Sequence, residues 1–180
     1  KFLIENGADI YLENNQRENA LNIACGSHNS FEMVKLLVES GINPNHNKSK
    51  GFTPLEFMTI GGNFDAVNYL LEKIALSTLN YSRALFIACG NGSLEIVKLL
   101  ILKGCEINKI GKINRKVKRS FTPLHIACEK GNFEIVKYLV EKGADIIKQD
   151  SNGNSPLDKA YENGSLEIVN YLKKQIILRQ

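Results

Sequence analysis

The residue types that most often carry catalysis or bind metals are few in this chain of 180 residues, which has three histidines and four cysteines. His28 and His46 have no cysteine or carboxylate nearby at the spacing of a metal site, and no two cysteines form a C-x-x-C pair. The sequence also lacks a nucleophile elbow and a phosphate-binding loop. We therefore expect no enzymatic activity, no cofactor, no metal site and no small-molecule substrate.

One segment concentrates charge of a single sign. Residues 109–120, KIGKINRKVKRS, contain six Lys or Arg side chains and no acid. Such a local positive field favours contact with an acidic protein surface, and the string RKVKR also fits a nuclear-import signal or a nucleic-acid contact. A solvated loop without a partner is the third interpretation. Only Phe121 is near enough to supply the aromatic stacking that a nucleic-acid interface uses.

The amino-acid composition indicates which class of protein contains these residues. With 43% apolar and 23% charged residues, the chain falls in the globular range, and no apolar run approaches the roughly 20 residues of a membrane span. Four cysteines without a secretory signal predict reduced thiols and an intracellular location, in the cytoplasm or alternatively the nucleus. Lys1 stands inside an apolar pattern without an initiator Met, so we expect a cut through a longer protein.

An internal repeat dominates the rest of the sequence. The segment from Thr122 to Ile146, TPLHIACEKGNFEIVKYLVEKGADI, returns in register from Asn19, Thr53, Arg83 and Ser155. Residues 1–10 match Lys137 to Ile146 position for position, so the chain opens inside a repeat. The sequence therefore contains five copies and one partial copy, and we expect each of the five copies to form the same local structure.

Each copy has its own helix signals. Thr53-Pro54, Thr122-Pro123 and Ser155-Pro156 place an N-cap hydroxyl before a proline at the first helical position. A left-handed turn should end this short helix at the glycine or asparagine found in the same place of every copy: Asn29, Gly62, Gly92, Gly131 and Gly164. The next residue is Ser or Asn in every copy, which predicts the N-cap of a second helix.

The second helix carries one apolar stripe, as at Phe133, Val136, Leu139 and Val140, and it should end at Gly143. One helix pair cannot bury such a stripe by itself. Stacked pairs bury a continuous core between neighbours, which predicts an all-α solenoid of stacked helix-turn-helix units.

Two copies share the string G-F-T-P-L-x-x-x-x-x-x-G-N-F-x-x-V-x-Y-L-x-E-K: Gly51 to Lys73 and, with Ser120 in place of the first Gly, Ser120 to Lys142. This string resembles the ankyrin repeat. The tetrapeptide Gly-Ala-Asp-Ile at 7–10 and 143–146 does so too. The resemblance implies a curved ankyrin-repeat solenoid in which β-turn fingers and first helices form a concave binding face. It also implies that His125, in Thr-Pro-Leu-His, bonds neighbouring backbone rather than a substrate.

The predicted organisation is one ankyrin-repeat domain over residues 1–180. Its parts are the end of a truncated repeat at 1–14, repeats at 15–47, 48–79, 80–111, 112–149 and 150–180, and a long basic finger at 109–120. The segment between the motif leucines Leu85 and Leu124 is longer than in the other copies, and the addition falls in this finger. Because fingers contact partners, specificity is expected there.

The cysteines fit the same stack. Cys25, Cys89 and Cys128 occupy one place on the first helix, and neighbouring helices lie about 8–10 Å apart, too far for a disulfide. We predict that these three are free thiols packed as small core residues. Cys105 replaces the Ala of a Gly-Ala-Asp turn, where it is either a filler or a more exposed thiol.

Residues that face a partner are transferred from the family by position and by the basic finger. The predicted set is Lys50, Phe52, Ile60, Asn80, Ser82, Asn91, Arg115, Lys116, Lys118, Arg119, Phe121, Glu129, Lys130, Asn152, Asn154 and Glu162. Phe52, Ile60 and Phe121 stand out, because apolar side chains can anchor an interface. The alternative for each Phe is that it covers the turn beside it.

The predicted function is a non-catalytic scaffold that binds another protein through its concave face. Two alternatives remain open. The basic finger Lys109–Ser120 would make the chain an adaptor for nuclear import or nucleic acid, or the chain would be the targeting module of a longer enzyme or effector.

Overall fold

The computed structural model describes residues 1–26, 31–45, 52–74, 81–111 and 120–179. Within these residues the chain is helical, and residues 1–79 and 80–180 form two compact units. The division falls between two of the predicted repeats. One domain over the whole chain stays a prediction, and each unit is described separately below.

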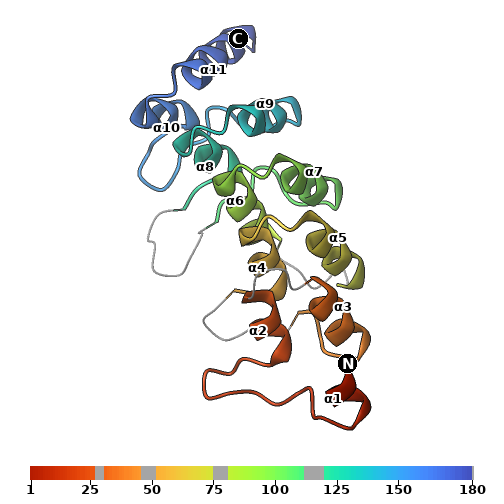
Figure 1. Ribbon diagram of the computed structural model, residues 1–180. Coiled ribbons are helices and arrows are strands. Elements are labelled where there is room, and N and C mark those ends of the chain that lie inside the picture. Colours follow the sequence, from red (N-terminus) through yellow and green to blue (C-terminus); the bar gives the residue numbers. More distant parts are fainter. Residues whose placement is uncertain (27–30, 46–51, 75–80, 112–119, 180) are drawn as a thin grey trace. The chain divides into compact units, whose positions relative to one another are not determined.

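The first unit contains five helices in its described part (Figure 1). These are α1 (Phe2–Glu5), α2 (Ala20–Gly26), α3 (Phe31–Glu39), α4 (Pro54–Ile60) and α5 (Phe64–Lys73). The pairs α2–α3 and α4–α5 are the helix-turn-helix units, with α2 packed on α4 and α3 on α5. Phe31 meets Tyr69 edge to face with ring centroids 5.9 Å apart, so aromatic contact joins the two second helices.

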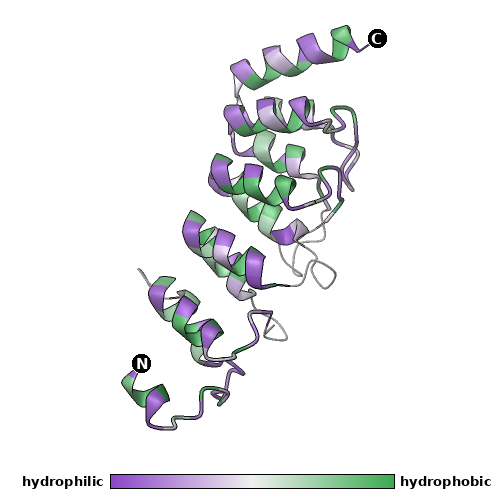
Figure 2. Ribbon diagram, turned by 90° about the vertical axis from the view of Figure 1, so that its right-hand side faces the viewer, coloured by the Kyte–Doolittle hydropathy of each residue, from purple (hydrophilic) through white to green (hydrophobic). Residues whose placement is uncertain are grey.

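The second unit stacks three further pairs in the same way. Its helices are α6 (Ser82–Asn91), α7 (Leu94–Leu102), α8 (Pro123–Glu129), α9 (Phe133–Glu141), α10 (Pro156–Asn163) and α11 (Leu166–Leu178). First helices α6, α8 and α10 pack in one row, and second helices α7, α9 and α11 pack in another (Figure 1). Hydrophobic and hydrophilic residues both occur along the helices (Figure 2). The second helices α7 and α9 are buried on one side, whereas α6 and α8 are each buried over six consecutive residues.

The core is built from the apolar positions that recur in the sequence. Leu21, Leu55, Leu85 and Leu124 are at most 1% exposed, and the fifth motif leucine, Leu157, is only half-buried at the end of the row. Cys25, Cys89 and Cys128 are buried free thiols, as predicted. Burial raises the pKa of the Cys25 thiol to about 12, so this group stays protonated and packs as a small apolar residue.

The helix signals behave as predicted at the first helices. Thr53, Thr122 and Ser155 are N-caps whose hydroxyls accept a backbone N–H, each with proline at the start of the helix. The glycines predicted to end these helices have positive φ, between 67° and 77°, at Gly62, Gly92, Gly131 and Gly164. A β-carbon is strained in this conformation, which explains why glycine recurs there.

The second helices differ from the prediction in how their N-cap side chains are used. Asn63 caps α5 by accepting the N–H of Ala66 at 3.0 Å, but the Asn132 side chain makes no capping bond to α9. Its amide instead donates to the backbone oxygen of Cys89 at 2.7 Å, in the preceding repeat. Asn163, which is the last residue of α10 and not an N-cap, likewise donates its amide to Glu129 O at 2.9 Å. These side chains satisfy carbonyls at the ends of α6 and α8, and so they join repeats rather than cap helices.

Truncation of a motif leucine tests this core. Leu124→Ala should lower the free energy of unfolding by about 2–5 kcal/mol, because Leu124 is 0% exposed and its removal leaves a cavity. The measurement is urea denaturation. Leu102→Ala is the matched control, since Leu102 is 81% exposed, and it should change stability by less than about 0.5 kcal/mol. A loss under about 1 kcal/mol for Leu124→Ala would contradict the repeat register.

Candidate partner-binding face

The first helices and the turns that precede them carry most of the predicted partner residues; we call this surface the first-helix face. In the described part of the chain it includes Phe52, Ile60, Ser82, Asn91, Glu129, Lys130, Asn152, Asn154 and Glu162. Lys50, Asn80, Arg115, Lys116, Lys118 and Arg119 lie outside the described residues. Each unit therefore carries predicted partner residues, and those of each unit are described separately.

In the first unit the face is apolar at α4. Ile60 is 44% exposed, and Phe57, three residues earlier on the same helix, is half-buried. Phe52 meets the ring of Phe57 edge to face with centroids 5.6 Å apart. Phe52 thus covers its own turn and still adds to the exposed edge. These three residues, which we call the α4 patch, can receive an apolar side chain from a partner.

Phe121 is the predicted anchor that the structure removes from this set. Its side chain is only 5% exposed, because Phe121 and Gly111 exchange both backbone hydrogen bonds at 2.9 Å in an antiparallel bridge. This bridge draws the phenylalanine inward at the base of the long finger. This burial agrees with the alternative interpretation, a Phe that covers the turn beside it.

The same bridge joins the residues on either side of segment 112–119, which lies outside the described residues. Gly111 packs against Phe86, a side chain of α6 that is 1% exposed. On the other side, Ser120 accepts the N–H of Ser151 at 3.2 Å and donates its own N–H to Ser151 Oγ at 2.9 Å. The base of the finger is therefore bonded to its own return arm and to the next turn. Lys109, at its start, pairs with Glu106 at 3.0 Å.

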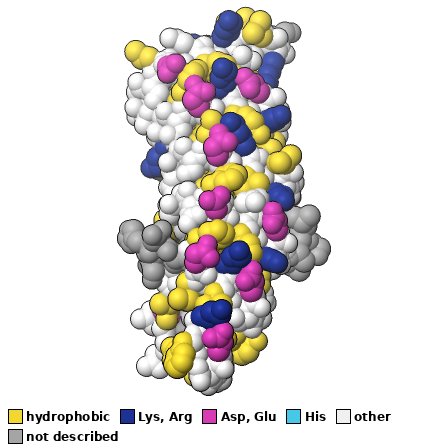
Figure 3. Space-filling model, turned by 45° about the vertical axis from the view of Figure 1, so that its right-hand side comes forward, with side chains coloured by type: hydrophobic (Ala, Val, Ile, Leu, Met, Phe, Trp, Pro, Cys, Tyr) yellow, Lys and Arg dark blue, Asp and Glu magenta, His cyan; other side chains and the backbone are white. Residues whose placement is uncertain are grey.

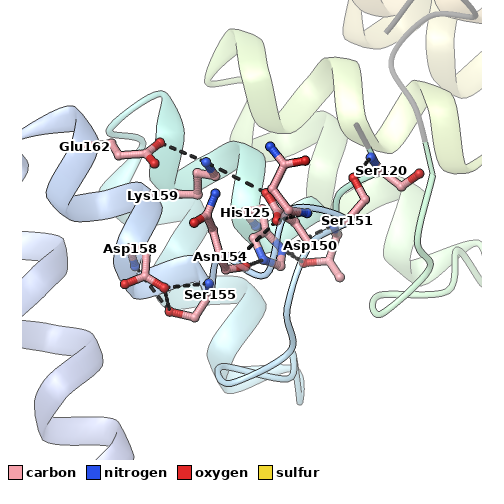
Figure 4. A network of polar contacts seen from close by, with 11 residues as sticks. Ser120, His125, Asp150, Ser151, Asn154, Ser155, Asp158, Lys159 and Glu162 are labelled. Atoms are coloured by element: carbon pink, nitrogen blue, oxygen red, sulfur yellow. Dashed lines mark hydrogen bonds and ion pairs between the residues drawn. The ribbon is translucent and has the colours of Figure 1, made fainter. Parts of the chain in front are cut away.

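In the second unit a chain of polar contacts runs beneath the face (Figure 4). Asp150 accepts the backbone N–H groups of Asn152 and Asn154 at 2.7 and 3.0 Å, which shapes the turn before α10. The carbonyl of Asn154 lies 3.0 Å from His125 Nε2. Glu162, predicted to face a partner, lies at the outer end of this chain, 2.8 Å from Lys159 Nζ. Sequence reasoning missed Lys159, although its charge in an otherwise apolar helix position was a visible signal.

His125 has the structural role that the family resemblance implies. Its Nδ1 accepts the backbone N–H of Thr122 at 3.3 Å, so the proton of the neutral ring is on Nε2, which donates to Asn154 O. Burial lowers the pKa of His125, while the Asn154 carbonyl and Asp150 oppose this shift in part. The imidazole is 0% exposed and has no access to a substrate.

In the part of the chain that the structure describes, the side chains that could bind a metal ion do not cluster. No group of three or more His, Cys, Asp or Glu side chains there is arranged to hold a metal ion. Burial raises the pKa of Cys105 to about 12, the reverse of what a reactive thiolate needs. Among the described helices, none combines the length and the apolar character that crossing a membrane requires.

The face formed by the second helices differs in character. Acidic and basic side chains lie next to one another along it (Figure 3), as in the pair Lys98–Glu95 on α7, with 2.8 Å between nitrogen and oxygen. Such exposed ion pairs contribute little to stability, and because opposite charges lie together they produce no strong positive or negative electrostatic field. Exposed apolar side chains also lie on the second helices, among them Met33 on α3, Phe64 on α5 and Leu166 on α11.

Lowering the pH tests the role assigned to His125. The folded pKa lies below the unfolded value of 6.5, so the unfolded chain takes up the proton first and stability falls as the pH drops below about 6.5. Urea denaturation between pH 7.5 and 5 should show this loss. In His125→Gln, which cannot titrate, the loss should be clearly smaller. Equal pH dependence in both proteins would refute the buried neutral imidazole.

A methyl group at Gly111 tests the base of the finger. In Gly111→Ala the new β-carbon would overlap the Phe86 ring, whose Cζ lies 2.8 Å away, and overpacking of this kind costs about 1–3 kcal/mol. The matched control is Gly26→Ala, because no atom lies within 4 Å of a β-carbon there and the residue is helical. In thermal unfolding, only Gly111→Ala should have a lower melting temperature than the unmodified protein. Equal stability would mean that the base of the finger is not packed on Phe86.

The comparisons with known proteins agree with this architecture. The family model described as ankyrin repeats (3 copies) matches residues 1–80, 32–111 and 85–178. A putative ankyrin repeat protein of Acanthamoeba polyphaga mimivirus is 32% identical over 118 residues, which are 63% of this chain and 34% of the relative. A putative ankyrin repeat protein of Rickettsia bellii is 37% identical over 78 residues, 42% of this chain and 65% of the relative.

Alpha-latrocrustotoxin-Lt1a of Latrodectus tredecimguttatus is 30% identical over 120 residues, 64% of this chain but 8% of the toxin. The chain thus spans about a third of the viral relative and less than a tenth of the toxin. With family matches that extend over nearly all of its length, the chain belongs to the ankyrin repeat family.

Proposed function

We propose that this chain is a non-catalytic binding module that holds a partner protein on its first-helix face. Ankyrin repeats generally mediate interactions between proteins. The observation that carries the proposal is the α4 patch. Ile60 is 44% exposed at a position where the other first helices have Gly26, Gly90, Glu129 and Glu162, so an apolar side chain stands among small and acidic ones.

The surroundings of the patch support a role in recognition. Exposed apolar side chains near the centre of an interface give most of its affinity, while polar residues at the rim exclude water. Polar side chains are available at the first helices of the second unit and in the turn before α10, in Glu129, Lys130, Asn152 and Glu162.

The basic finger is proposed as the part of the module that speeds encounter with an acidic partner. The sequence from 112 to 119 supplies five Lys or Arg residues without an acid. The described base of the finger supports the assignment, because Gly111, Phe121 and Ser120 anchor both of its ends. Exposed charges of this kind act on the association rate and are screened over about 8–10 Å at ordinary salt.

The test begins with affinity capture and mass spectrometry to identify a partner, followed by binding kinetics with the purified partner. Ile60→Ala should raise the dissociation rate about tenfold, a loss of about 1.4 kcal/mol that is typical of an apolar anchor. The control is Leu102→Ala on α7, an exposed leucine outside the proposed face, which should leave both rates within about twofold. Equal effects of the two substitutions would refute the first-helix face.

The finger is tested by changing Arg115, Lys116, Lys118 and Arg119 together to Ser. Association should slow and lose most of its salt dependence, while the dissociation rate stays the same. Unchanged association would reduce the finger to a solvated loop. Retained protein binding together with lost duplex or single-strand binding would instead assign the finger to nucleic acid.

A further inference from the structure

Lys159 occupies a position of the first helix that is apolar in every other copy of the repeat. The equivalent residues are Ile23, Phe57, Ile87 and Ile126. Lys159 is nevertheless 1% exposed, as deeply buried as Ile126. A buried ammonium is unfavourable unless opposite charges and hydrogen-bond acceptors surround it. The last repeat therefore contains a charge that the stacking of helices alone does not require.

Two carboxylates surround this ammonium, and they differ in burial and in distance (Figure 4). Lys159 Nζ donates to Glu162 Oε2 at 2.8 Å, and the Glu162 side chain is 56% exposed on the first-helix face. Asp150 Oδ2 lies 3.8 Å from the same nitrogen, and the Asp150 side chain is 0% exposed. At 3.8 Å the two groups attract each other, but they are beyond hydrogen-bond distance.

Asp150 keeps one acceptor atom unused. Its Oδ1 accepts the N–H groups of Asn152 and Asn154, whereas its Oδ2 is buried without a hydrogen bond. A buried acceptor in this state is costly, and the nearest donor described for it is the ammonium of Lys159. Lys159 thus donates a hydrogen bond to Glu162 and lies near Asp150, whose Oδ2 could accept a hydrogen bond from the same ammonium.

We propose that Lys159 is a two-position lysine that exchanges between Glu162 and Asp150. When Glu162 turns outward to a basic side chain of the partner, Lys159 moves inward and donates to Asp150 Oδ2, so the buried charge remains compensated. The triad contains two negative charges and one positive charge, and its surplus negative charge is at the exposed end. This inference rests on the proposed function, because it makes Glu162 a contact of the first-helix face for a partner's lysine or arginine.

The position of Asp150 links this exchange to the neighbouring turn. Asp150 holds the amides of Asn152 and Asn154, and the Asn154 carbonyl accepts from His125 in α8. A lysine drawn onto Oδ2 adds a bond to a carboxylate that already organises this turn. The amides of Asn152 and Asn154 should then exchange with solvent more slowly.

The test uses Glu162→Gln, which removes the charge of the exposed carboxylate and mimics its engagement by a partner. A crystal structure of this variant should place Lys159 Nζ within about 3.2 Å of Asp150 Oδ2, and NMR should show several-fold slower hydrogen exchange at Asn152 and Asn154. In Lys159→Met, where the exchanging group is absent, adding Glu162→Gln should leave the exchange rates of these two amides unchanged.

A Lys159 nitrogen that remains near 3.8 Å from Asp150, or that leaves for solvent, would overturn the proposal. The same is true of unchanged amide exchange in Glu162→Gln. Since neither measurement involves a partner, failure here leaves the binding face untouched, and failure of the binding kinetics above leaves the two-position lysine untouched.

Discussion

Burial of apolar surface between neighbouring repeats is the interaction on which this structure depends. The helices of one pair are short, most of them seven to ten residues, and each has an apolar stripe that its own partner helix cannot cover. In the second unit, α8 and α9 are covered by α6 and α7 on one side and by α10 and α11 on the other. Leu124, Ala127 and Cys128 are fully buried as a result, and the small side chains permit close approach of the helices.

Polar groups between the repeats are arranged to permit this burial. Helix ends leave carbonyl groups that must find donors, and here the donors come from the next repeat, as in the bond from Asn132 to Cys89 O. The turns are joined similarly, because Asn108 accepts the N–H of Asp145 and donates to Gly143 O. Stacking therefore determines both the core and the position of the turns, and through them the surface offered to a partner.

Much of this could be predicted from the sequence, because the signals are local and repeated. Capping at Thr122, the left-handed glycine at Gly131 and the buried Leu124 depend on residues within one copy of the motif. Other features depend on contacts between copies and could not be predicted in this way. Asn132 donates its amide to Cys89 O in α6 instead of capping its own helix, and Phe121 is buried where Gly111 pairs with its backbone. Within the last copy, Lys159 is buried between Glu162 of its own helix and Asp150 of the preceding turn, and a helical pattern alone does not predict the approach of Asp150.

The central claim is that the partner lies on the first helices and not on the second. The most direct measurement is site-specific photo-crosslinking of the captured complex, with a photoreactive amino acid placed in turn at Ser82 on α6 and at Glu95 on α7. Our account predicts a crosslink to the partner from Ser82 and none from Glu95, within one unit of the same protein. A crosslink from Glu95 alone would contradict it.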